Sequence, residues 1–210
     1  MTSSSATLQS AAPARVLVFA GSTRAGSWNR KLARVAAALA REAGAEVTHI
    51  ELADHELPLY NADLEARGTP EASLRLKALF HAHDAFIVCS PEYNAGLPPL
   101  TKNTFDWVSS PVSGHPLWAD GLRPFRGKVA GMLTASPGAL GGVRSLAQLS
   151  ALLFNLQCWL VPQPFSLARA HEAFDADGHL AQDAARSAVQ RLVAQTVWAA
   201  QRLRPDTENS

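Results

Sequence analysis

The chain has 210 residues, enough for one globular domain and not comfortably for two, and its 47% hydrophobic and 18% charged residues permit a normal core. Its 19 basic and 18 acidic residues leave a formal net charge of +1, which argues against a nucleic-acid-binding surface and against a polybasic membrane anchor. No apolar run reaches the length of a membrane span.

The first part of the chain is expected to start with a tail and then to alternate strands with helices. Residues 1–14 are small, polar and uncharged, without the basic start and apolar stretch of a signal peptide, so they predict a disordered tail. A strand is predicted over residues 15–20 (RVLVFA), followed by a helix over 29–43 that is rich in alanine, leucine and arginine. A second strand is predicted over residues 46–52.

The next helix has a clear start signal. Thr69-Pro70-Glu71 offers a capping hydroxyl, a proline for the first turn and an acid near the positive end of the helix dipole. A third strand is predicted over residues 85–89, whose continuous apolar run is typical of a strand covered on both faces. A helix is then predicted around residues 100–109.

The last part of the chain continues the alternation. Strands are predicted over residues 128–134 and 157–161, with a helix over 143–155 between them. A long helix over residues 180–203 closes the domain, and residues 205–210 are expected to be a frayed end.

Five strands alternating with five helices predict an α/β fold over residues 15–204. The alternation implies a parallel sheet with right-handed crossovers and helices on both faces. The length fits a flavodoxin-like doubly wound sheet with strand order 2-1-3-4-5. In such a sheet the ligand lies beyond the carboxyl ends of the strands, at the reversal between strands 1 and 3.

The two cysteines, Cys89 and Cys158, lie in apolar stretches. We interpret them as buried free thiols, with a disulfide or a redox pair as the alternative. Few cysteines and no targeting signal together favour a cytoplasmic protein.

The loop after the first strand, residues 21–29 (GSTRAGSWN), has the composition of an anion site. It offers three hydroxyls, Arg24 and two glycines at the start of a helix, where free N–H groups and the helix dipole favour a phosphate monoester. It is not a Walker P-loop, because Ser27-Trp28 stand where Lys and Ser/Thr are required, and the pattern Gly-x-Gly-x-x-Gly is absent. A capped helix after a glycine turn is the alternative interpretation.

Two further loops follow strands at the same edge of the predicted sheet. In residues 90–98 (SPEYNAGLP), prolines stiffen the chain, Gly96 permits close approach, and Tyr93 and Asn94 offer a ring face and an amide, which suits an aromatic heterocycle. In residues 135–142 (ASPGALGG), three glycines let backbone amides approach a planar ligand. An ordinary proline-rich turn is the alternative for residues 90–98, and for residues 135–142 alone an ordinary turn is equally favoured. Three such loops at the same edge of one sheet together predict a ligand site.

The motifs resemble those of the NADPH-dependent FMN reductase family, which includes quinone, chromate and azo-dye reductases. The matching segments are GSTRAGSWN at 21–29, LPLYNADLE at 57–65, PEYN at 91–94 and KNTFDW at 102–107, in order within roughly residues 15–200. The resemblance implies a flavoprotein that binds FMN, takes hydride from NADPH or NADH, and passes electrons to a small acceptor by a ping-pong mechanism. The acceptor would be a quinone, a free flavin, an azo compound or a metal oxyanion.

The resemblance also implies which residues hold FMN. Its phosphate would be held by Ser22, Arg24, Ser27 and Asn29. The flavin would be bordered by Pro91, Glu92, Tyr93, Asn94 and Gly96, and on its other side by Ser136, Gly138 and Gly141. We expect no metal and no catalytic acid or base, because the cofactor carries the chemistry.

A homodimer or homotetramer is expected, with Phe105, Trp107 and Trp118 near the subunit boundary. The rival function is a non-enzymatic flavin-binding electron carrier or redox sensor. The near-neutral charge disfavours it, because docking carriers exploit a strong field.

Two features depart from the family pattern. Pro98-Pro99 stands in place of Pro-Gly and Thr101-Lys102 in place of Leu-Lys, both expected at the mouth of the flavin site, where they would affect acceptor choice. Residues 111–126 are long for their place and are expected to form a lid or an interface segment.

Overall fold

The computed structural model describes residues 12–204. Most of the tail predicted over residues 1–14, and the whole of the end predicted over 205–210, lie outside the described residues. No helix within residues 12–204 is both long and apolar enough to cross a membrane.

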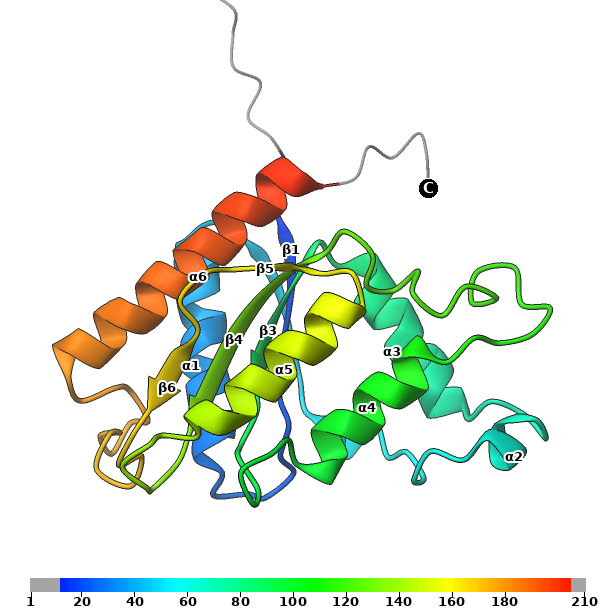
Figure 1. The fold of residues 1–210 in the computed structure, drawn as a ribbon. Helices are drawn as coiled ribbons and strands as arrows, with labels where there is room; N and C mark the ends of the chain where they lie inside the picture. The colour runs from blue at the N-terminus through cyan, green and yellow to red at the C-terminus, as the bar shows by residue number, and fades with distance from the viewer. Residues whose placement is uncertain (1–11, 205–210) are drawn as a thin grey trace, which may run out of the picture.

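A parallel sheet forms the centre of the molecule, with the strand order β2-β1-β3-β4-β5 (Figure 1). The predicted α/β class and strand order are therefore confirmed. A sixth strand that the sequence analysis did not predict pairs with the end of β4, where Leu133 lies opposite Phe165. The strands are β1 (Arg15–Ala20), β2 (Glu46–Ile50), β3 (Ala85–Cys89), β4 (Val129–Ala135), β5 (Trp159–Leu160) and β6 (Phe165–Leu167).

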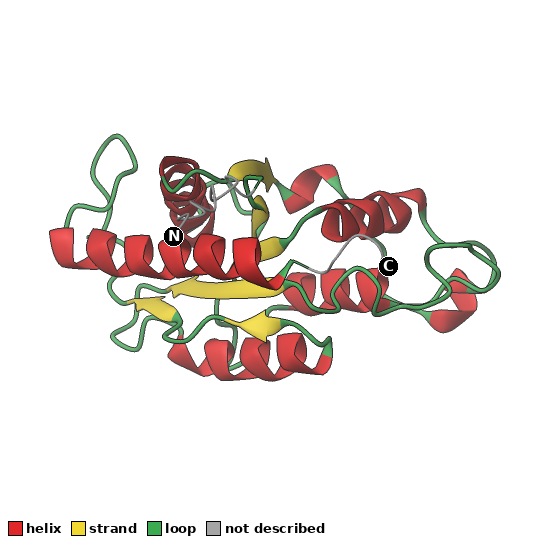
Figure 2. Ribbon diagram, turned by 90° about the horizontal axis from the view of Figure 1, so that it is seen from above, coloured by secondary structure: helices red, strands yellow, loops and turns green. Residues whose placement is uncertain are grey.

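Helices cover both faces of the sheet, as the view from above shows (Figure 2). The five predicted helices are present, with ends shifted by up to three residues. The predicted cap Thr69 is wrong, because Pro70 occupies the N-cap position and no side chain caps this helix. The helices are α1 (Trp28–Glu42), α2 (Ala62–Glu65), α3 (Glu71–Ala82), α4 (Pro99–Ser109), α5 (Val143–Asn155) and α6 (Asp183–Leu203), with a 3-10 turn over Leu52–Asp54.

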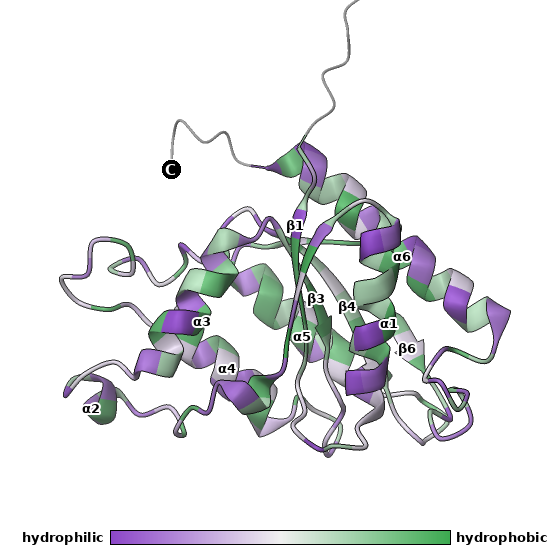
Figure 3. Ribbon diagram, turned by 180° about the vertical axis from the view of Figure 1, so that it is seen from behind, coloured by the Kyte–Doolittle hydropathy of each residue, from purple (hydrophilic) through white to green (hydrophobic). Residues whose placement is uncertain are grey.

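The alternation of side chains along β1 divides the core into two parts. Val16 and Val18 pack among the buried residues of α1 and α6, whereas Leu17 and Phe19 pack among those of α3, α4 and α5. Both faces of the sheet are covered, so the central strands are apolar over most of their length (Figure 3). The polar exceptions are Arg15 at the start of β1 and the buried Thr134 in β4.

Two strands are shorter than predicted. The second ends at Ile50, because the chain turns into the 3-10 helix at Leu52. The fifth is reduced to Trp159–Leu160, since Gln157 has φ +65°, which lies in the left-handed region and not in the strand region.

Both cysteines are buried free thiols, as predicted. They belong to opposite sides of the sheet, Cys89 to the core beneath α1 and α6 and Cys158 to the other, so they do not pair. Burial raises the pKa of the Cys89 thiol and raises that of Cys158 to about 12, which makes both poor nucleophiles.

The aromatic side chains expected at a subunit boundary lie inside this chain. Phe105 and Trp107 are 0% exposed and Trp118 is 4% exposed. Trp107 donates from Nε1 to the carbonyl oxygen of Pro58 at 2.8 Å, and Trp118 packs edge-on against His81. The prediction that these aromatics form the interface is therefore wrong, because they complete the core of the subunit.

The segment over residues 111–126 does not cover the carboxyl edge of the sheet. It joins the last turn of α4 to the first residue of β4, and a helix-to-strand connection in a parallel sheet lies at the amino edge (Figure 1). Trp118 within it contacts His81, just before β3 begins. The prediction that this segment forms a lid over a site at the carboxyl edge is therefore wrong. The alternative, that it is an interface segment, stays a prediction.

Candidate functional site

A pocket of ≈ 290 Å³ opens at the carboxyl edge of the sheet, where the loops after β1, β3 and β4 meet. Most of the predicted site residues line it, together with Trp28, Ala135 and Pro137, which the sequence analysis did not nominate. The predicted residues Asn94, Gly96, Gly138 and Gly141 are not among its lining. The lining is Ser22, Arg24, Ser27, Trp28, Asn29, Pro91, Glu92, Tyr93, Ala135, Ser136 and Pro137.

Larger hollows exist elsewhere on the described surface, but they are not formed where several strand ends meet. One of ≈ 460 Å³ lies between residues 62–69 and 111–113, and one of ≈ 360 Å³ lies on α1 beside residues 176–179. The volume of a hollow does not by itself indicate a ligand site. The carboxyl-edge pocket is the better candidate, because three strand ends and the start of a helix meet there.

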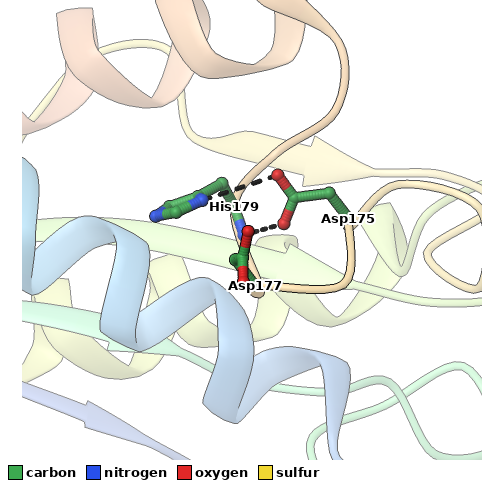
Figure 4. Close-up of side chains that lie close together, drawn as sticks. All are labelled: Asp175, Asp177 and His179. Carbon is green, nitrogen blue, oxygen red and sulfur yellow. Dashed lines mark hydrogen bonds and ion pairs between the residues drawn. The ribbon is translucent and has the colours of Figure 1, made fainter.

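Asp175, Asp177 and His179 form an exposed cluster beside the hollow on α1, with their ligand atoms within 4.8 Å of one another (Figure 4). The cluster is a turn held by its own bonds, since the His179 N–H donates to Asp175 Oδ1 at 2.8 Å. That backbone donor is the main reason why the pKa of Asp175 is lowered. The expectation of no metal stays a prediction.

The first loop brings the start of α1 to the pocket. Gly21 donates from its N–H to the Cys89 carbonyl at 3.0 Å, and a Cβ at this position would lie 1.9 Å from Thr101 Oγ1, so only glycine fits. Ser27 is the N-cap of α1 and accepts from the Arg30 N–H at 3.4 Å. The first turn of α1 carries no acidic residue, so the positive end of its dipole stays available to an anion.

Arg24 is the cation that the pocket offers. Its guanidinium lies 5.1 Å from the centroid of the Trp28 ring, and no carboxylate within the described chain lies at ion-pair distance from it. Arg30, by contrast, pairs with Glu51 at 2.7 Å. The charge of Arg24 is therefore free to pair with a ligand.

Asn29 is buried and holds two loops together. Its Nδ2 donates to the Ala135 carbonyl at 2.8 Å, and its Oδ1 accepts from the Ala135 N–H at 3.0 Å. These bonds occupy both ends of the amide and leave one Nδ2 hydrogen. Asn29 thus fixes α1 against the end of β4, and a direct contact with a phosphate stays a prediction.

The second loop is a tight two-residue turn. Tyr93 and Gly96 exchange backbone hydrogen bonds of 3.0 and 2.9 Å across Asn94 and Ala95, whose φ angles are +49° and +64°. Such turns favour glycine at the second position, so Asn94-Ala95 gave only a weak signal in the sequence. The turn leaves Tyr93 52% exposed beside the pocket.

Two side chains of α5 hold this turn. Glu92 binds Arg144, whose hydrogen bond lowers the pKa of the carboxyl, and Gln148 binds the backbone on both sides of Gly96. A Cβ on Gly96 would lie 3.0 Å from Gln148 Oε1, so the close approach predicted at this glycine is made by α5.

Two of the three glycines of the third loop, Gly141 and Gly142, are required by packing. Gly141 and Gly142 have φ angles of +61° and +92°, and a Cβ on them would lie 2.4 Å from Ser166 Oγ and 2.3 Å from Thr134 Oγ1. Ser136 donates from its N–H to the Leu167 carbonyl at 3.1 Å. The unpredicted strand β6 therefore supports this wall of the pocket.

The residues that depart from the family pattern, at positions 98–99 and 101–102, differ in how far they are buried. Pro98 precedes α4 and is buried, whereas Pro99 is exposed as its first residue. Thr101 is 0% exposed and its hydroxyl lies 3.0 Å from that of Ser90, so it is a core residue beneath Gly21. The expectation that Thr101 lies at the mouth is wrong.

Two motif segments that are far apart in the sequence meet on α4. Asn103 donates to the Pro58 carbonyl at 2.9 Å and accepts from the Tyr60 N–H at 2.7 Å. Trp107 donates to the same Pro58 carbonyl. The segment LPLYN is therefore held by KNTFDW, a contact that spacing alone did not reveal.

Several known proteins with similar sequences or folds are described as reductases or oxidoreductases. The model of the family NADPH-dependent FMN reductase matches residues 14–172. An NAD(P)H-dependent FMN reductase of Pseudomonas aeruginosa is 36% identical, over 88% of this chain and 94% of that protein. A quinone reductase of Pseudomonas putida is 34% identical, over 85% and 90%. Among solved structures, the flavoenzyme FerB of Paracoccus denitrificans, an NAD(P)H:(acceptor) oxidoreductase, is 31% identical with a TM-score of 0.76, over 90% of this chain and 98% of that one.

Proposed function

The chain belongs to the NADPH-dependent FMN reductase family, and from this we propose that it is an FMN-dependent NAD(P)H oxidoreductase whose electrons go to a small acceptor such as a quinone. The resemblance seen in the sequence motifs is thereby confirmed. The relatives named as reductases of FMN and of quinones support the reaction class.

One observation of this structure carries the proposal most directly. One pocket is lined by the start of α1, which has no acidic residue in its first turn, by the hydroxyls of Ser22 and Ser27, and by Arg24, which has no carboxylate partner in the described chain. This donor set suits the phosphate monoester of FMN, because backbone N–H groups and one guanidinium bind a dianion well. The residues present therefore fit the cofactor that the family implies.

When bound, FMN would supply the redox chemistry, accepting hydride from NAD(P)H and passing electrons on. The chain contributes binding, orientation and the exclusion of water. Ser22, Ser27 and Arg24 would hold the phosphate, while the second and third loops form walls on which a flat ring can rest. Glu92 stays ionised because Arg144 lowers its pKa, and the buried Cys89 stays a thiol, so neither serves as a proton donor or a nucleophile.

Acceptor choice is proposed to be loose. Tyr93 and Leu140 of the two walls are 52% and 58% exposed, and they offer stacking and apolar contact. Few directional hydrogen bonds are available to discriminate among flat aromatic acceptors, which suits quinones and similar rings.

Assembly as a homodimer or homotetramer stays a proposal. The aromatics first nominated for it are buried, but the described surface carries other large apolar side chains, including Phe154 and Trp159, 74% and 60% exposed. Light scattering at micromolar concentration tests it, and a monomer would contradict it. A cytoplasmic location stays a prediction from the sequence.

Anaerobic stopped-flow mixing tests the proposed enzyme activity. The FMN-loaded protein is mixed with excess NADPH, and the loss of the oxidised flavin absorbance is followed. Bleaching without any added protein supports a reductase. A flavin that is still oxidised after minutes would indicate a carrier that depends on a separate reductase.

A further inference from the structure

Glu92 of the second loop caps a helix that begins about fifty residues later in the chain. Its Oε2 accepts from the backbone N–H groups of Arg144 and Ser145 at 3.0 and 3.3 Å. These are the second and third residues of α5, whose N–H groups an N-cap side chain normally satisfies. The N-cap position itself is Gly142, which has no side chain, so Glu92 fulfils this role from another loop.

The Arg144 side chain closes the same contact. Its Nε donates to Glu92 Oε1 at 2.8 Å, and its Nη2 donates to the same oxygen. The Glu92 side chain is only 8% exposed, although the pocket lies beside it. All four hydrogen bonds of the carboxylate therefore go to the first turn of α5, and the charge of Arg144 is neutralised there.

Gln148, one turn further along α5, holds the other end of the turn. Its Oε1 accepts from the Leu97 N–H at 3.1 Å, and its Nε2 donates to the Ala95 carbonyl at 3.3 Å. Ala95 has a φ of +64°, which is unfavourable for a residue with a Cβ and persists only where neighbours fix it. Glu92 and Gln148 thus fix both ends of a strained turn.

We propose that Glu92 is a positioning residue that joins the second and third loops into one rigid wall of the pocket by capping α5, and that it is not itself a ligand of the cofactor. The proposal deepens the proposed function, because the wall concerned is the one on which the flavin would rest. Gln148 secures the far end of the same wall.

A ligand and a positioning residue differ in what a substitution does before any cofactor is present. If Glu92 acts through α5, its loss loosens the backbone of the cofactor-free protein. Glutamine in its place retains an oxygen that accepts the two backbone N–H groups, so it restores most of the order although it lacks the charge. If Glu92 instead acts on the cofactor by its charge, glutamine does not restore binding.

Hydrogen exchange of single amides, followed by NMR on the full cofactor-free chain, tests the proposal. In Glu92→Ala we expect the Arg144, Ser145 and Gly96 amides to exchange about fivefold faster, the effect of one lost helix cap, whereas Glu92→Gln stays within about twofold of the original protein. Gln148→Ala should speed exchange at Leu97 and leave Ser145 unchanged. Glu71→Ala is the matched control, because Glu71 lies in the first turn of α3 and pairs with an arginine, Arg75, one turn later at 2.5 Å, away from the pocket.

FMN titration of the same variants completes the test. We expect the dissociation constant to rise about fivefold in Glu92→Ala and to return close to its original value in Glu92→Gln. Unchanged exchange in Glu92→Ala, or equal loss of FMN affinity in the alanine and glutamine variants, would overturn the proposal. A chain that binds no FMN at all would remove the proposed function, yet the exchange measurements would still decide whether Glu92 caps α5.

Discussion

Replacing Arg24 by alanine probes the phosphate site directly. In the part of the chain that the structure describes, no carboxylate pairs with Arg24, and its guanidinium only lies over the Trp28 ring at 5.1 Å. The substitution therefore removes a cation without leaving a partner charge unpaired. A charge-assisted hydrogen bond to phosphate contributes on the order of 2 kcal/mol, so the dissociation constant of FMN should rise about 30-fold.

Riboflavin provides the internal comparison, because it lacks the phosphate. It should bind far more weakly than FMN to the original protein, and Arg24→Ala should leave its affinity unchanged. Both affinities can be measured by quenching of flavin fluorescence during titration. Arg41→Ala is the control, because Arg41 lies in the last turn of the same helix, at the end away from the pocket. Equal affinity for riboflavin and FMN, or an equal loss of both in Arg24→Ala, would refute the phosphate-site reasoning.

Three further predictions concern turnover, stability and pH. Initial rates against NADPH at several fixed concentrations of menadione should give parallel double-reciprocal lines, because one pocket serves donor and acceptor in turn; intersecting lines would exclude ping-pong turnover. Asn29→Ala should lower the free energy of unfolding by about 3 kcal/mol, because it leaves the buried Ala135 N–H and carbonyl without hydrogen-bond partners. Urea denaturation measures this loss, with Asn155→Ala, a substitution of an exposed asparagine, as the control. Equal free energies of unfolding for the two variants would contradict the prediction. The pKa of Glu92 is lowered in the folded protein, so its ion pair stabilises the fold at pH values above 4.5, the ordinary pKa of a glutamate. This contribution is lost as the pH falls through the lower pKa of the folded state. Thermal melts of the original protein and Glu92→Gln should therefore converge on acidification, and a constant difference between them would contradict the assignment.

The sequence by itself determined the features that depend on local spacing. Alternating apolar runs and helical periods specified the α/β class, the order of the sheet and hence the edge at which a ligand lies. The hydroxyls and arginine between β1 and α1 predict an anion site, because a helix start has the same free N–H groups in any fold, and the structure places these side chains in one pocket. The family motifs then named the cofactor.

Only the tertiary structure decided which distant groups meet. The sequence placed Phe105 and Trp107 near a subunit boundary, whereas packing against the sheet and the Pro58 segment makes them core residues. The motif predicts Glu92 at the border of the flavin, and the fold shows in addition that its carboxylate accepts from N–H groups in the first turn of α5. A strand of three residues such as β6 is too short to show an alternating pattern in the sequence. Local patterns report what a residue favours over one turn or one pleat, whereas a partner fifty residues away is chosen by how the helices pack on the sheet.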